Sequence, residues 1–137
     1  TPGDGYDCVS TFGTAKNIMT VGAVEDVAGG YSGPSSVVMS SFSGWGPVDD
    51  GRIKPDIVTN GVGLNSTDSG GDDAYGSKSG TSMATPYVSG IVGLMLSVEP
   101  GMTPVEIKRR ALDSTTNTDK LEPYSQAGYI SAHNAVR

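Results

Sequence analysis

Cysteine, histidine and charged residues are scarce in this chain of 137 residues, and each shortage excludes or disfavours a class of structure or function. Cys8 is the only cysteine, so no disulfide can form within the chain. The only histidine, His133, lies near the C-terminus, so the rest of the chain offers no imidazole base. The nine lysines and arginines are scattered, with only Lys108, Arg109 and Arg110 adjacent, which makes nucleic acid a poor partner. The formal net charge of −6 comes from a charged fraction of 18%, and we interpret it as an aid to solubility.

The residues that are plentiful are those of a folded protein with many tight turns. Hydrophobic residues make up 36% of the chain, and it contains 20 glycines and 8 prolines. That composition is too varied for a linker or a disordered tail. The length is enough for one domain with its own core, and no internal repeat or linker divides it.

Short apolar runs that contain β-branched residues predict strands at residues 17–24, 36–42 and 57–59. The polar stretch at residues 66–76 is rich in glycine and aspartate and predicts a surface loop. Because these runs are mixed with helices, we expect the α/β fold class with a largely parallel sheet.

The strongest helix signal covers residues 82–98, where apolar side chains occupy nearly every face. Such a helix is buried between layers or spans a membrane. About 17 residues is short for a span, and Pro86 and two glycines lie inside it, so we predict a core helix and no membrane span. Thr103 and Glu106 form a capping box that predicts a second helix to about residue 114, and residues 131–136 predict a third, short one.

Ser82 lies where a glycine-rich segment becomes the first helix. The first N–H groups of a helix have no partner within it, and they carry the positive end of its dipole. A serine there combines a hydroxyl with a natural donor for an oxyanion. Position alone would favour a plain helix cap by Ser82 or Thr81.

The local string decides between these interpretations. Residues 80–86 read Gly-Thr-Ser-Met-Ala-Thr-Pro, which resembles the serine signature of the subtilisin-like serine proteases, the subtilases. Residues 17–24, 41–47, 54–61 and 128–135 resemble further segments of that family in the same order. Tyr87 stands where many members have histidine, and Thr59-Asn60 replaces the usual Ala-Pro. The resemblance implies that residues 1–137 are the C-terminal part of a subtilase catalytic domain, a three-layer αβα fold whose N-terminal half is absent.

The resemblance also implies the roles of individual residues. Ser82 would be the catalytic nucleophile, with Thr81 and Gly80 supporting the oxyanion hole and the cleft. Ser10, Thr11 and Phe12 would border the pocket for the residue before the scissile bond. The substrate would be a protein or peptide. Family habit implies a secreted, periplasmic or cell-surface enzyme.

Two thirds of the implied triad are missing from the chain. In subtilases the triad follows the order Asp, His, Ser. Upstream of Ser82 there is no histidine and no His-Gly-Thr string. An Asp-Ser-Gly string occurs once, at residues 68–70, but no histidine lies between it and Ser82, as the order Asp, His, Ser requires. The His, the Asp and the oxyanion Asn would therefore come from the N-terminal half as a partner. Alone, the chain should be inactive, and the flank of its buried helix should be exposed.

Two alternatives stay open. An α/β-hydrolase-like esterase would order its triad as Ser82, then Asp113 or Asp119, then His133. The segment before Ser82 is polar and glycine-rich, whereas that enzyme class places an apolar strand there. A non-catalytic fragment or pseudo-protease binding module would also explain the missing residues.

Metal binding has weak support in the sequence. Asp68, Asp72 and Asp73 lie in a glycine-rich stretch, but their spacing does not match an EF-hand loop. Family resemblance implies that carbonyls at residues 12–14 and Asp26 take part in calcium binding in some members. We predict no metal site and no cofactor in this chain, with structural calcium left open for the intact enzyme.

Overall fold

The computed structural model of the chain describes residues 8–116 and 125–137. Its main sheet has four strands in the order β1-β4-β8-β7. The β1–β4 and β4–β8 pairs are parallel, and the β7–β8 pair is antiparallel. The strands of this sheet are β1 (Val21–Val24), β4 (Ile57–Asn60), β7 (Thr115–Thr116) and β8 (Tyr129–Ile130). Two antiparallel pairs lie outside it: β2 (Gly46–Pro47) with β3 (Ile53–Lys54), and β5 (Leu64–Thr67) with β6 (Tyr75–Lys78).

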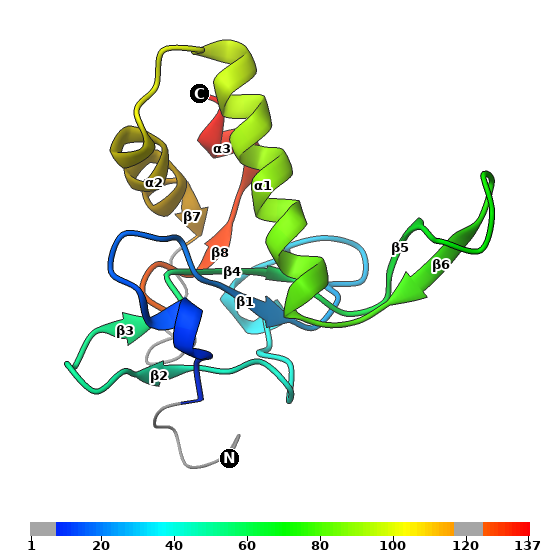
Figure 1. Cartoon of the computed structure of the whole chain (residues 1–137), viewed down its shortest axis with the longest axis horizontal. Helices are drawn as coiled ribbons and strands as arrows, with labels where there is room; N and C mark the ends of the chain where they lie inside the picture. Colours follow the sequence, from blue (N-terminus) through cyan, green and yellow to red (C-terminus); the bar gives the residue numbers. More distant parts are fainter. Residues whose placement is uncertain (1–7, 117–124) are drawn as a thin grey trace.

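Three α-helices pack together on one face of the main sheet (Figure 1). They are α1 (Thr81–Val98), α2 (Pro104–Asp113) and α3 (Ala132–Ala135). Because side chains of a strand alternate between faces, β4 contributes to both sides. Ile57 joins the core under the helices, whereas Val58 packs with Val24 and Val37 on the opposite face. The described residues thus supply the sheet and one helical layer. Two 3₁₀ helices, η1 (Thr11–Thr14) and η2 (Pro34–Ser36), complete the regular structure.

The structure confirms the α/β class, the largely parallel sheet, all three helices, and strands within residues 17–24 and 57–60. The capping box is present at the start of α2, where the Glu106 N–H donates to Thr103 and the Glu106 carboxylate accepts from the Thr103 N–H.

Two predictions about extended segments are wrong. Residues 36–42 form only a single bridge, between Val24 and Met39. The Glu25 N–H donates to the Val38 carbonyl and the Ser40 N–H donates to the Ala23 carbonyl, after which the chain turns away. Residues 66–76 are not wholly a loop, because both of their ends belong to the β5–β6 hairpin. Both hairpin strands are mostly exposed, so they lack the apolar alternation that marks a strand in sequence.

Helix α1 is buried along one stripe only, whereas its sequence predicts burial on every side. The stripe consists of Ala84, Val88, Ile91 and Met95. On the other flank Leu94 is 53% exposed and Val98 64% exposed. By length and composition the helix is also apolar enough to cross a membrane, with a mean hydropathy of 1.3 over its 18 residues, a property that soluble core helices share.

Candidate active site

Ser82 is the second residue of α1, immediately after the turn that starts the helix. Gly80 caps the helix with φ 150°, a backbone conformation that favours glycine. The Gly80 carbonyl accepts from the Met83 and Ala84 N–H groups, at 3.0 and 3.3 Å. The Ser82 N–H lies in the first turn, where the helix offers no carbonyl partner. Since Ser82 is exposed, its hydroxyl and the positive end of the α1 dipole meet at the surface.

Gly61 fixes the position of this turn against the main sheet. It follows β4 directly, and its N–H donates to the Val24 carbonyl of β1 at 3.1 Å. Its own carbonyl accepts from the Gly80 N–H at 2.7 Å. A Cβ atom at Gly61 would lie 2.5 Å from the Ala23 Cβ and 2.9 Å from the Gly80 carbonyl oxygen. The two strands and the start of α1 therefore meet so closely that only glycine fits.

Replacing Gly61 with alanine should destabilise the chain by about 1–3 kcal/mol, because the added methyl group must push the Gly80 turn away from β1. The measurement is urea unfolding followed by the fluorescence of Trp45, the only tryptophan. Gly70→Ala is the matched control, since its Cβ would lie 3.4 Å from the Ala74 Cβ, an ordinary contact. Equal unfolding midpoints for the two variants would contradict this role of Gly61.

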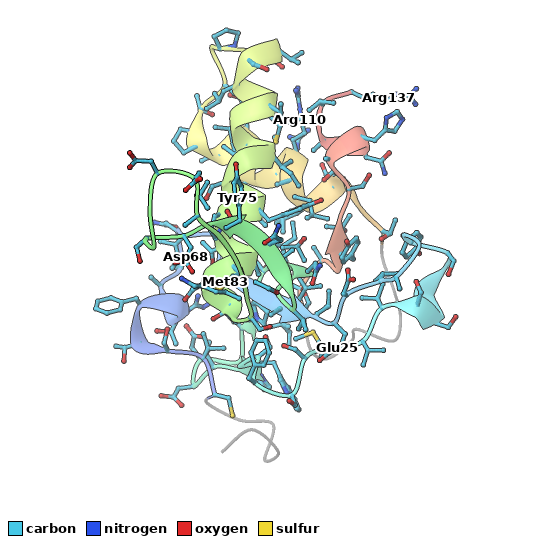
Figure 2. All side chains as sticks on the ribbon, turned by 90° about the vertical axis from the view of Figure 1, so that its right-hand side faces the viewer. Glu25, Asp68, Tyr75, Met83, Arg110 and Arg137 are labelled. Carbon is cyan, nitrogen blue, oxygen red and sulfur yellow. The ribbon has the colours of Figure 1, made fainter. Side chains whose placement is uncertain are left out.

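A cleft of about 490 Å³ opens between the start of α1 and the β5–β6 hairpin. Figure 2 looks at the free end of the hairpin and places its residues Asp68 and Tyr75 in front of Met83 on α1. The helix contributes Ser82, Met83, Pro86 and Tyr87 to the lining, and the hairpin contributes Leu64, Asn65, Ser66, Thr67, Gly76 and Lys78. Sequence reasoning missed this hairpin wall, because it assigned residues 66–76 to a loop.

The predicted pocket-rim residues do not line this cleft. Ser10 precedes η1, Thr11 and Phe12 lie within it, and all three side chains are exposed. Thr81 and Gly80 do lie beside Ser82, in the turn described above. The assignment of Ser10, Thr11 and Phe12 to a substrate pocket stays a prediction.

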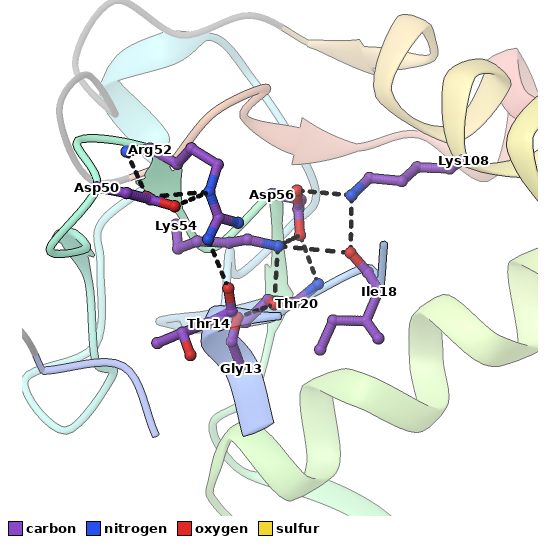
Figure 3. A network of polar contacts seen from close by, with 9 residues as sticks. All are labelled: Gly13, Thr14, Ile18, Thr20, Asp50, Arg52, Lys54, Asp56 and Lys108. Atoms are coloured by element: carbon purple, nitrogen blue, oxygen red, sulfur yellow. Dashed lines mark hydrogen bonds and ion pairs between the residues drawn. The ribbon is translucent and has the colours of Figure 1, made fainter. Parts of the chain in front are cut away.

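A buried ion-pair network lies beneath the loop that leads into β1 (Figure 3). Lys54 and Asp56 form its centre, with side chains only 2% exposed and 2.6 Å between the Lys54 Nζ and an Asp56 carboxylate oxygen. The Lys108 ammonium of α2 reaches the other Asp56 oxygen at 2.9 Å and also donates to the Ile18 carbonyl at 2.7 Å. The Thr20 N–H donates to Asp56 at 2.7 Å. The network therefore joins the start of β1, the start of β4 and α2.

The surroundings of Asp56 keep it ionised. Burial alone would raise the pKa of its carboxyl group, but the hydrogen bonds from Lys54, Thr20 and Lys108 outweigh burial and hold the pKa below its usual value. The string Lys-Pro-Asp at residues 54–56, one of the segments that resembles the subtilases, thus encodes a fully paired buried carboxylate.

His133 does not lie near Ser82. It is exposed on α3, which packs beside the C-terminal half of α1, whereas Ser82 lies at the other end of that helix (Figure 1). The 18 residues of α1 span about 27 Å. Asp113 forms an exposed ion pair with Arg109 at 3.7 Å, and Asp119 lies outside the described residues. The triad of the α/β-hydrolase alternative is therefore not assembled from Ser82, Asp113 and His133.

Several of the oxygen atoms considered for calcium already accept hydrogen bonds from protein groups. The Thr14 carbonyl accepts from the Arg52 guanidinium at 2.9 Å, and the Asp26 carboxylate accepts from the Asn60 amide at 3.0 Å. Asp68 is paired with Lys78 at 2.7 Å. Within residues 8–116 and 125–137, no group of three or more His, Cys, Asp or Glu side chains is placed to bind a metal ion. The absence of a metal site in this chain stays a prediction, and structural calcium in the intact enzyme is left open.

Comparison with known proteins identifies the family to which the chain belongs. A model of the subtilase family matches residues 5–129. The chain belongs to the subtilase family. Among relatives of this subtilase, serine protease AprX of Bacillus subtilis is 33% identical in an alignment that covers 93% of this chain and 31% of AprX. Pyrolysin of Pyrococcus furiosus is 34% identical over 93% of this chain and 11% of its own length.

The solved structure of the Clostridium perfringens CspB protease has the same fold in this region. It aligns with a TM-score of 0.73 and 28% identity over 95% of this chain and 28% of the CspB chain. The subtilase chain therefore spans less than a third of each of these three proteins. The relatives named as proteases carry their activity on chains that are several times longer.

Proposed function

We propose that this subtilase chain provides the nucleophile of a serine endopeptidase. Ser82 attacks the scissile carbonyl, and its backbone N–H donates to the oxyanion that forms. Thr81 supports the oxyanion hole and Gly80 leaves room for the substrate backbone. The observation that carries the proposal is the exposed Ser82 at the positive end of α1, facing a cleft of about 490 Å³. The substrate is a protein or peptide that lies along this cleft.

The remaining catalytic groups come from an N-terminal half of the same domain. Its His takes the proton from the Ser82 hydroxyl and then gives it to the leaving amine, while its Asp orients the His and its Asn donates to the oxyanion. Water then hydrolyses the acyl-enzyme on Ser82. We call this chain joined to that half the intact protease. The proposed enzyme is secreted, periplasmic or exposed at the cell surface. It does not bind nucleic acid, uses no cofactor and does not span a membrane, and structural calcium is left open.

The test compares the chain alone with the intact protease on a fluorogenic peptide. A serine without a base and an orienting acid is a poor nucleophile, so the chain alone should give no turnover above background. The intact protease should cleave the peptide. Turnover by the chain alone, or none by the intact protease, would overturn the proposal.

The exposed flank of α1 is the surface that this N-terminal half covers. At Gly90 and Gly93, no atom of residues 8–116 or 125–137 lies within 4 Å of the position that a Cβ atom would occupy, so each leaves an open site on this flank. In the chain alone, Gly93→Ala should stabilise the helix by about 0.5–1 kcal/mol, because alanine costs less backbone entropy.

In the intact protease the same substitution should be destabilising, because a neighbouring element would pack against Gly93. Thermal unfolding of both forms gives the comparison. Arg109→Ala, at an exposed position of α2 and outside the α1 flank, is the control and should act alike in both forms. Stabilisation by Gly93→Ala in both forms would argue against a covered flank.

A further inference from the structure

Among the described residues, the lining of the cleft beside Ser82 has one charged group, the ammonium of Lys78. The other lining residues, from α1 and from the hairpin, are apolar or carry neutral polar groups. The Lys78 side chain is 54% exposed, so it is open to a molecule that enters the cleft. An ammonium group next to the nucleophile favours negative charge at that place and disfavours positive charge.

The hairpin holds this lysine in place from behind. Lys78 lies on β6, opposite Leu64 of β5, and its ammonium is 2.7 Å from the carboxylate of Asp68. Asp68 is 30% exposed and is not part of the cleft lining, so the carboxylate orients Lys78 without filling the cleft. The Ser69 N–H donates to the same carboxylate oxygen at 2.8 Å.

Gly76 makes room for this arrangement. A Cβ atom at Gly76 would lie 2.6 Å from an Asp68 carboxylate oxygen, so a side chain there would displace the carboxylate. The hydrogen bonds from Lys78 and Ser69 lower the pKa of Asp68 and so favour its carboxylate form. The hairpin is therefore built to present a positive charge to the cleft.

We propose that Lys78 selects peptides with an acidic side chain within three residues of the scissile bond. The inference rests on the proposed function, because it assumes that the cleft receives the substrate of Ser82. A glutamate or aspartate carboxylate of the substrate accepts a hydrogen bond from the Lys78 ammonium, which has three donors and can keep Asp68 as a second partner. Because the ammonium is half exposed, the effect is modest, about fivefold in selectivity.

The experiment measures kcat/KM of the intact protease on paired fluorogenic peptides that differ only by Glu or Gln. The pair is placed in turn at each position from three before to three after the scissile bond. The wild-type enzyme should prefer Glu about fivefold at one position. Lys78→Gln should bring that ratio to about one, and Asp68→Asn should raise it, because the ammonium loses its competing carboxylate. Lys16→Gln removes an exposed lysine outside the cleft and should leave the ratio unchanged.

The outcomes separate this inference from the function on which it rests. Cleavage of the Gln peptides with a Glu-to-Gln ratio near one at every position would overturn the selectivity alone. A Glu preference that persists in Lys78→Gln would also overturn it. Failure to cleave any peptide would overturn the proposed function and the selectivity together.

Discussion

Replacing Ser82 with alanine should reduce peptide hydrolysis by the intact protease by a factor on the order of 10⁶, the loss measured for removal of the nucleophile in a subtilisin triad. The substitution removes the atom that forms the acyl-enzyme. It leaves the α1 backbone and the cleft in place, because Ser82 is exposed and alanine favours helix. The measurement is kcat on a fluorogenic peptide, with circular dichroism to confirm that the variant is folded.

His133→Ala is the informative control for this prediction. His133 is exposed on α3, at the other end of α1 from Ser82, so its loss should leave kcat unchanged. An α/β-hydrolase-like enzyme would lose activity with either substitution. Equal losses from the two variants would therefore replace the subtilase mechanism with that alternative, and retention of activity by Ser82→Ala would exclude Ser82 as the nucleophile.

Replacing Asp56 with asparagine should destabilise the chain by about 3–5 kcal/mol. The variant leaves the Lys54 ammonium, whose side chain is 2% exposed, without the carboxylate 2.6 Å away. Asp50→Asn is the matched control. It breaks an ion pair with Arg52 in which the Asp50 side chain is 58% exposed, and it should cost less than about 1 kcal/mol. Urea unfolding midpoints give both values, and equal midpoints would show that the buried pair does not stabilise the fold.

The pH dependence of stability provides a second readout of the same pair. The pKa of Asp56 is lower in the folded chain than in the unfolded chain, where the pKa of an aspartate is about 3.9. Its contribution to stability is therefore fully present above that value and is lost as the pH falls through the folded pKa. Wild-type stability should fall more steeply with acidification below about pH 4 than that of Asp56→Asn. Parallel curves would assign the acid sensitivity to other groups.

The sequence predicted the elements whose side chains follow a clear period or a known start signal. The capping box at Thr103 and Glu106 located α2, and the apolar run at residues 57–59 located β4. The strand predicted at residues 36–42 did not form, because this segment bridges β1 only at Met39 and turns at residues 40–43. The β5–β6 hairpin also left no sign in the sequence. Its strands are exposed and are held together by backbone hydrogen bonds, so they need no pattern of apolar residues.

The candidate site was predictable in part. The string at residues 80–86 located Ser82 and the start of α1, because local chemistry and helix geometry follow from adjacent residues. The closeness of Gly61 to Gly80 and the position of Lys78 beside Ser82 depend on how distant segments pack. The network around Asp56 likewise needs Lys108 from α2, which is 52 residues away along the chain by residue number. Such contacts are set by tertiary packing and leave no signal in a single sequence.

Mapping the site of a fluorophosphonate adduct tests the central claim most directly. This reagent labels a serine only when a neighbouring base activates it. Mass spectrometry of the labelled intact protease should place the adduct on Ser82, and the chain alone should remain unlabelled under the same conditions. An adduct on a different serine, or equal labelling of Ser82 in the chain alone, would contradict the account.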